Sequence, residues 1–207
     1  MSVATSTVSI AMQPELAVPE DFIWRLSVEQ YHAMIHAGIL TEADPVELLE
    51  GWLIPKMPKN PPHGLAIDLA REILTRLLPN GWHVKSQDPL TLADSEPEPD
   101  VLVVRGERRQ YRDKHPGAAE VWLLIEVSDT TLARDRGLKK RTYARAAVPV
   151  YWIINLVENQ LEVYTAPSGA TETPDYGERR AYALTEAVPL VIEEQELAFI
   201  PVRELFP

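Results

Sequence analysis

The segment Val121-Trp122-Leu123-Leu124-Ile125-Glu126-Val127-Ser128 predicts the central strand of a sheet. Its apolar residues follow one another without a polar interruption, as in strands that are buried on both faces. A second apolar run, Pro99-Asp100-Val101-Leu102-Val103-Val104, precedes it and predicts a neighbouring strand. Asp100 opens the first strand and Glu126 lies near the end of the second. Two carboxylates at the ends of neighbouring strands can converge on one point.

Helical patterns flank these strands. Apolar residues at helical spacing predict an amphipathic helix over His63–Leu78, which ends at a Pro-Asn-Gly turn. Ser27 and Gln30 have the spacing of a capping box, so we expect a short helix from there to about Ala37, with a stop at Gly38. A third helix, rich in lysine and arginine, is expected over Arg134–Ala147.

Turn residues and short apolar runs predict the remaining elements. Glu50-Gly51 and Glu158-Asn159 are expected to close two hairpins. A loop rich in Pro, Gly and Thr is expected over Thr165–Arg180. The other predicted strands are Val46–Leu49, Trp52–Ile54, Trp82–Gln87, Leu90–Ala93, Val150–Asn155, Leu161–Tyr164, Leu190–Ile192 and Leu197–Ile200. This order predicts an α/β fold with a mixed, centrally antiparallel sheet. We expect a flexible arm at residues 1–19 and one domain over residues 20–207.

Composition narrows the class of protein. The chain has 207 residues and no cysteine, which excludes disulfides, thiolate zinc sites and cysteine nucleophiles. The first 19 residues do not have the pattern of a signal peptide, and no segment has the apolar length of a membrane span. We therefore expect a soluble, cytoplasmic protein with no membrane partner.

The charge is distributed unevenly. The net charge is −11, which argues against general coating of nucleic acid. Residues 105–145 nevertheless hold 11 of the 20 Lys+Arg and 6 of the 31 Asp+Glu, a local charge of 11 − 6 = +5. This segment could face phosphates. Chance clustering of surface cations is the alternative, and charge by itself favours that alternative.

The two carboxylates favour a metal site. Two converging acids repel one another, and a hard divalent cation relieves that repulsion while it keeps several waters. We expect Mg²⁺, with Mn²⁺ as a substitute, bound by Asp100, Glu126 and the Val127 carbonyl. Lys139 follows on the basic helix, where an ammonium suits a reaction that builds negative charge on phosphate.

Each of these residues also has a simpler interpretation. Asp100 could be an ordinary polar strand end, and Glu126 could pair with an arginine. Lys139 could form a solvated i,i+4 salt bridge with Asp135, and Lys140 is the competing lysine.

Motifs in one order along the chain carry a family resemblance. The chain resembles the Uma-type restriction endonuclease family of the PD-(D/E)XK nuclease superfamily over about Ser27–Tyr164, and weakly in the tail Arg203–Phe206. The residues that match are Val46–Gly51 (Val-Glu-Leu-Leu-Glu-Gly), His63 at a helix start, Pro99-Asp100-Val101, Glu126-Val127-Ser128, the set Asp135, Lys139 and Tyr143, and Val148–Trp152.

The resemblance implies a restriction-endonuclease-like sheet with flanking helices. It places Asp100 and Glu126 on the metal. The superfamily usually has a lysine two residues after the glutamate, where this chain has Ser128, and Lys139 matches the place from which the family supplies that lysine. Glu47 and His63 are expected to reach the same cluster, although His63 could be only a capping or surface residue and Glu50 is the alternative to Glu47.

These features predict a metal-dependent endonuclease that hydrolyses phosphodiester bonds of DNA. The residues expected to contact DNA phosphates are Arg134, Arg136, Lys140 and Arg141. Cleavage of both strands usually takes two sites, which favours a homodimer. The second hypothesis is a catalytically inactive, nuclease-like module that binds nucleic acid or protein, and the third is hydrolysis of another phosphoester.

Overall fold

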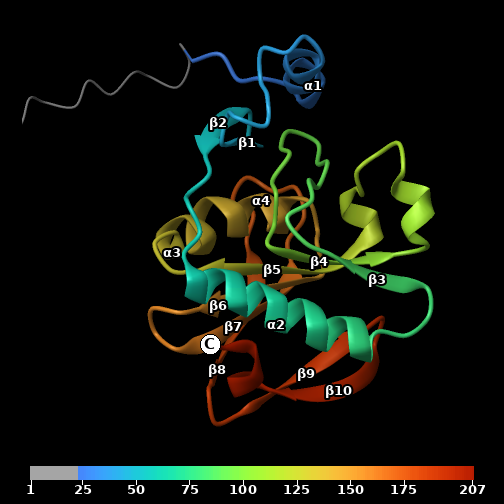
Figure 1. Cartoon of the computed structure of the whole chain (residues 1–207), viewed down its shortest axis with the longest axis vertical. Coiled ribbons are helices and arrows are strands. Elements are labelled where there is room, and N and C mark those ends of the chain that lie inside the picture. Colours follow the sequence, from blue (N-terminus) through green and yellow to red (C-terminus); the bar gives the residue numbers. More distant parts are fainter. Residues whose placement is uncertain (1–22) are drawn as a thin grey trace, which may run out of the picture.

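A six-stranded mixed sheet forms the centre of the computed structural model, which describes residues 23–207 (Figure 1). The β5–β6 pair is parallel and all its other neighbouring pairs are antiparallel. In spatial order the strands are β3 (Trp82–Lys85), β4 (Val101–Arg105), β5 (Val121–Ser128), β6 (Val150–Asn155), β7 (Gln160–Pro167) and β8 (Tyr176–Ala183). The predicted mixed sheet is confirmed. The arm expected at residues 1–19 lies outside the described residues.

The expectation of an antiparallel centre is wrong, because the central pair β5–β6 is parallel. Between these strands the chain crosses over through α3 (Leu132–Arg134), the π-helical turn η4 (Asp135–Lys139) and α4 (Lys140–Arg145). A crossover of this length lets the chain return in the direction in which it left. A π turn interrupts the helix predicted over residues 134–147. The helix ends at Arg145, and Ala147 just beyond it has a φ of +57°.

Both faces of the sheet are covered, which explains the continuous apolar character of β5. On one face Leu123, Ile125 and Val127 pack with helix α2 (Pro61–Leu77), the hairpin β9 (Ala187–Ile192)–β10 (Gln195–Pro201) and η5 (Val202–Leu205). On the other face Leu124 packs with α4 and the segment around Leu90. Figure 1 shows α2 crossing one face of the sheet.

A smaller cluster lies beyond the end of the sheet. The hairpin β1 (Val46–Leu49)–β2 (Trp52–Pro55) packs there against α1 (Val28–His36) (Figure 1). The hairpin turns at Glu50 and Gly51, which have φ of +49° and +79°. A Cβ on Gly51 would lie 2.6 Å from the Cβ of Arg25, so glycine is needed at this position. The predicted capping box at Ser27 and Gln30 is confirmed.

Three sequence-based expectations differ from the structure. Half of Thr165–Arg180 is strand, since β7 extends to Pro167 and β8 begins at Tyr176; most of β8 is exposed, so its sequence lacks an apolar signal. Leu90–Ala93 forms only a single bridge, at Thr91, among several prolines. Helix α2 begins two residues early, because Asn60 caps it ahead of two prolines. The remaining short helices are η2 (Arg108–Tyr111) and η3 (Ala118–Glu120).

Truncation of a core side chain on β5 should destabilise the folded protein. Leu124 is fully buried, so Leu124→Ala should lower the free energy of unfolding by about 2–5 kcal/mol through lost burial and the cavity that remains. Urea unfolding measures this change. The control is Val157→Ala at an exposed turn, which should change the free energy by less than about 0.5 kcal/mol. Equal midpoints for the two variants would contradict the central position of β5.

Candidate metal and catalytic site

The pairing of β4 with β5 brings Asp100 next to Glu126. Val101 is opposite Ile125, so Asp100, just before β4, lies opposite Glu126. The Val127 N–H donates to Asp100 Oδ2 at 2.9 Å. Both carboxylates are nearly buried, with 6% of Asp100 and 3% of Glu126 exposed. Because the sheet register sets this approach, neither side chain needs a flexible loop to reach the other.

The Val127 carbonyl faces the same space. In an antiparallel pair a residue directs its N–H and its C=O toward the same neighbouring strand. Strand β4 begins at Val101, so none of its residues is opposite Val127, and the Asp100 carboxylate accepts the Val127 N–H instead. The carbonyl oxygen of Val127 is therefore directed toward the side of the strand on which the Asp100 carboxylate lies.

Lys139 comes from the π turn and lies between two acids. Its Nζ donates to Glu126 Oε1 at 2.9 Å and lies 3.4 Å from Glu47 Oε1. The hydroxyl of Tyr143 donates to the same Glu126 oxygen at 2.6 Å. With 4% of Lys139 exposed, the alternative of a solvated salt bridge with Asp135 does not hold. Lys140 instead pairs with Asp175 at 2.8 Å.

Ser128 and Asp135 support this turn from the cavity side. Ser128, at the position of the usual superfamily lysine, donates from Oγ to Asp135 Oδ2 at 2.7 Å. Thr131 donates to the same Asp135 oxygen at 2.6 Å. Ser128 contacts Asp135, whereas Lys139 contacts Glu126 and Glu47. The serine therefore does not take the position of the lysine ammonium.

Glu47 and His63 complete the group. Glu47 on β1 is buried, and its Oε2 accepts from the Glu98 N–H at 3.1 Å. His63 lies in the first turn of α2, where its Nε2 is 3.3 Å from Asp100 Oδ1. Glu50, the alternative to Glu47, is instead held by Arg141 and Arg145 outside this group.

One small cavity of about 100 Å³ connects these residues. All the predicted catalytic and metal-binding residues line it: Glu47, His63, Asp100, Glu126, Val127 and Lys139. The volume corresponds to roughly three waters at ~30 Å³ each. Lys59, Asn60 and Asp129 also line it, and sequence reasoning missed them. Asn60 had a readable signal, since an asparagine before two prolines is a typical helix cap.

Burial and excess negative charge set the protonation of the site. Burial raises the pKa of Glu126 to about 8, helped by Asp100, Asp135 and Glu47 and opposed by Lys139. Burial alone would raise the pKa of Asp100, but His63, the Val127 N–H and Lys139 hold it below its usual value. Burial lowers the pKa of Lys139, but the surrounding acids raise it by more, so the net shift is upward. Lys139 is therefore a permanent cation.

The residues present fit a magnesium ion. Four nearly buried acids line the cavity with one buried lysine: Glu47, Asp100, Glu126 and Asp135. Among the described residues Glu126 Oε2 accepts no hydrogen bond. Within residues 23–207 no three His, Asp or Glu side chains are arranged to chelate a metal by themselves. Mg²⁺ suits such a site, since it takes one or two carboxylates and retains several waters.

The four predicted DNA-contacting residues are placed differently. Arg134 lines the cavity and donates to the Pro55 carbonyl at 2.7 Å, while its buried Nε has no partner in the part of the chain described. Arg136 binds Glu162 and Glu158, and Lys140 pairs with Asp175. Arg141 pairs with Glu50 at 2.6 Å.

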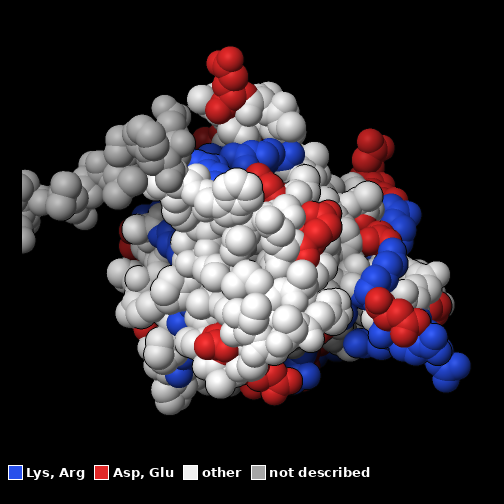
Figure 2. All heavy atoms as spheres, turned by 90° about the horizontal axis from the view of Figure 1, so that it is seen from above, with Lys and Arg blue, Asp and Glu red and all other residues white. Residues whose placement is uncertain are grey.

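Much of the positive charge of segment 105–145 is paired with acids. Several of its cations are paired with acids from elsewhere in the chain, such as Arg105 with Glu193 and Arg145 with Glu50. Seen from above, Lys and Arg gather at the margins of a largely uncharged surface (Figure 2). Among residues 23–207, no helix combines the length and the apolar character that crossing a bilayer requires.

Comparison with known proteins identifies one family. A family model described as "Uma2: Putative restriction endonuclease" matches residues 28–199. No protein with a curated functional description matches the chain.

Solved structures show the same fold. A crystal structure described as "a putative nuclease belonging to DUF820" from Anabaena variabilis matches with a TM-score of 0.64 and 15% identity, over 87% of this chain and 97% of that chain. The restriction-endonuclease-like sheet with flanking helices is thereby confirmed. The apo form of E. coli MS115-1 NucC matches with a TM-score of 0.30 and 14% identity over 45% of this chain and 51% of that chain, too weakly to support an inference.

Glu126 should make the metal-free protein less stable as the pH rises. Its pKa is raised from 4.5 to about 8 in the folded state, so the folded state binds the extra proton. The resulting stabilisation is fully present below pH 4.5 and is lost as the pH rises toward 8. Thermal unfolding with a chelator at pH 5 and pH 8 should show a fall in Tm that Glu126→Gln largely removes. An identical fall in the variant would contradict the raised pKa.

Proposed function

This chain belongs to the Uma2 family, and on that premise we propose that it is a Mg²⁺-dependent endonuclease that hydrolyses phosphodiester bonds of DNA. The observation that carries the proposal is the convergence of Asp100, Glu126 and Lys139 in one small cavity. These residues come from two strands and a helical turn, and the sheet register and the crossover hold them there.

Asp100, Glu126 and the Val127 carbonyl would hold the metal ion. When bound, Mg²⁺ supplies Lewis acidity toward a phosphate oxygen and lowers the pKa of a bound water. The protein prepares the ligands by its own contacts. His63 and the Val127 N–H orient Asp100, while Tyr143 and Lys139 orient Glu126 through Oε1.

Lys139 acts as a fixed positive charge. Since the acids around it raise its pKa above the ordinary lysine value, it stays protonated at neutral pH and cannot serve as a general base. A nearly buried ammonium stabilises negative charge that develops on a reacting phosphate. Glu47, 3.4 Å from Nζ, is the second acid that holds the ammonium in the cavity.

Arg134 is the proposed phosphate contact beside the reacting group. It lines the cavity, and no carboxylate among the described residues pairs with its guanidinium. Arg136, Lys140 and Arg141 each pair with an acid, so a DNA contact by any of them would have to compete with that ion pair. This difference favours Arg134 over the other three residues as the phosphate contact.

Removal of the catalytic groups should abolish nicking without unfolding. Asp100→Asn, Glu126→Gln and Lys139→Met should each reduce Mg²⁺-dependent nicking of plasmid DNA by at least about 100-fold, since each removes a group that contacts the metal or the reacting phosphate. Circular dichroism monitors folding. Lys85→Met removes a partly buried lysine that pairs with Asp88 outside the cavity and should retain wild-type nicking.

Three outcomes would contradict this assignment. Undiminished nicking by a folded Glu126→Gln protein would exclude the site. Calorimetry that detects DNA binding but no Mg²⁺ or Mn²⁺ binding at millimolar metal would instead identify a nuclease-like binding module. Cleavage of small phosphodiesters with no action on DNA would identify a different phosphoesterase.

Arg134→Ala should weaken DNA binding without a matching loss of turnover. One lost phosphate contact should reduce the slope of log K against log salt concentration by about 1 and weaken binding uniformly across sequences. Fluorescence anisotropy with two unrelated duplexes in Ca²⁺ buffer measures both quantities. An unchanged salt slope would remove Arg134 from the interface.

A further inference from the structure

The π turn that carries Lys139 is an unusual way to connect two helical segments. Asp135 and Lys139 are its first and last residues, and both side chains are nearly buried and line the cavity. The Lys140 N–H donates to the Asp135 carbonyl, five residues back. Such turns are rare and often occur at functional sites, because they alter the direction of the following side chains relative to an α-helix. The conformation therefore needs support from the surrounding structure.

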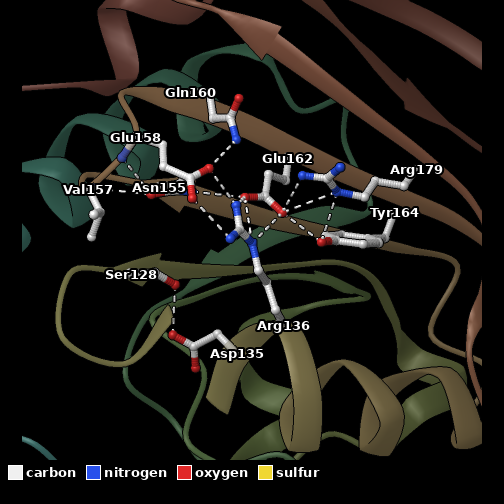
Figure 3. Close-up of polar contacts among 10 residues, drawn as sticks. All are labelled: Ser128, Asp135, Arg136, Asn155, Val157, Glu158, Gln160, Glu162, Tyr164 and Arg179. Atoms are coloured by element: carbon white, nitrogen blue, oxygen red, sulfur yellow. Dashed lines mark hydrogen bonds and ion pairs between the residues drawn. The ribbon is translucent and has the colours of Figure 1, made fainter. Parts of the chain in front are cut away.

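Arg136 supplies part of that support through contacts with β7 and with the loop before it. Its Nε donates to Glu162 Oε1 at 3.0 Å, and its terminal nitrogens donate to Glu162 Oε1 at 2.5 Å and Glu158 Oε2 at 2.6 Å. Figure 3 shows this guanidinium extending from the helical turn to β7 and to the loop before it. A bidentate pair fixes orientation as well as distance.

Glu162 is fully buried and has every oxygen occupied. Besides Arg136, it accepts from Asn155 at 2.9 Å and from the Tyr164 hydroxyl at 2.6 Å, and Arg179 lies 3.2 Å from Oε2 (Figure 3). Burial alone would raise the pKa of Glu162, but the hydrogen bonds from Arg136, Tyr164 and Asn155 lower it to about 2. The carboxylate is thus ionised throughout the neutral range.

A buried ion pair at this position is not explained by stability. Desolvation of two charges offsets much of their attraction, and apolar residues of similar volume often stabilise a protein equally well. What an ion pair adds is a directional contact between two elements. Here it joins β7 to the one turn whose geometry determines where the Lys139 ammonium lies.

The turn is held at two successive residues. At the first, Ser128 and Thr131 donate to the Asp135 carboxylate (Figure 3 shows the Ser128 contact), and the Tyr151 hydroxyl donates to the Asp135 carbonyl at 3.1 Å. The next residue, Arg136, reaches β7 through its ion pair with Glu162. Lys139 follows within the same turn, so a change in its winding would move the ammonium away from Glu126.

We propose that the Arg136–Glu162 ion pair fixes the winding of the π turn and so positions Lys139 for the reaction. This inference rests on the proposed nuclease function and assigns both residues as positioning residues, which do not touch the substrate. It also gives Arg136 a role other than the DNA contact expected from its place in a basic segment.

The experiment compares Arg136→Met and Glu162→Gln with a matched control, Arg145→Met. Arg145 has a similar exposure and also binds a buried glutamate, Glu50, but it lies beyond the π turn. The two test variants should lower kcat for Mg²⁺-dependent nicking by about 100-fold, as expected for misplacement of a catalytic group by about 1 Å, with KM nearly unchanged. Arg136→Lys should recover only part of kcat, because it lacks the bidentate fork. Arg145→Met should lose comparable stability and retain kcat.

A second readout does not require nuclease activity. In protein labelled with ¹⁵N-lysine, the Nζ resonance that disappears in Lys139→Met reports the ammonium that donates to Glu126. It should shift or broaden in Arg136→Met and Glu162→Gln and remain in place in Arg145→Met. If the wild-type protein does not nick DNA, the proposed function fails, and this resonance still tests the positioning.

Two results would overturn the inference. The first is an unchanged Lys139 resonance in folded Arg136→Met protein, with wild-type kcat wherever the wild-type protein is active. The second is a raised KM in Arg136→Met with wild-type behaviour of Glu162→Gln. That result would show that the guanidinium contacts DNA, because Glu162→Gln breaks the ion pair but keeps the arginine charge.

Discussion

The positive charge of Lys139 makes the rest of the cavity possible. Four carboxyl groups line it almost without solvent, and an isolated buried carboxylate is very costly. The ammonium contacts Glu126 and Glu47 directly, and His63 contacts Asp100 from the other side. Lys139 is the only nearly buried cation among the described residues that line the cavity. Burial, with a smaller contribution from the neighbouring acids, raises the pKa of Glu126. The site that we propose for Mg²⁺ therefore has more buried acids than buried cations.

Two ion-pair clusters connect the crossover between β5 and β6 to the rest of the molecule. Arg136 joins the π turn to Glu162 on β7, and Arg145 on α4 joins the hairpin through Glu50. Both clusters bury a glutamate against an arginine from the same basic segment. Much of that segment's positive charge is thus used inside the molecule. This internal use reduces the positive charge that the segment can offer to a phosphate backbone.

The location of the catalytic group has a consequence for DNA access. The predicted site lies in a cavity of about 100 Å³, bordered by Lys59, Asn60 and Arg134 at its margin. Such a space is far too small for a base pair. Contacts with the rest of a duplex would fall on the surrounding surface. We expect Arg134, which lines the cavity, to contact a phosphate of the bound duplex.

The sequence by itself predicted most of the main elements and several of the residues that line the cavity. Continuous apolar runs predicted β4 and β5, and the ordered motifs carried the family resemblance and with it Asp100, Glu126 and Lys139, because these signals are local in the chain. It did not show the parallel pairing of β5 with β6, the strand character of β8 or the π turn. Each of these depends on contacts between segments far apart in the chain.

The partners of the charged residues were likewise decided only by the tertiary structure. Nothing in the basic segment distinguishes Arg134 from Arg136 by residue type. Their roles separate because the crossover points one guanidinium at the cavity and the other at Glu162, 26 residues along the chain. The sequence specifies the charge of a side chain, but the packing of strands and helices decides which opposite charge lies beside it.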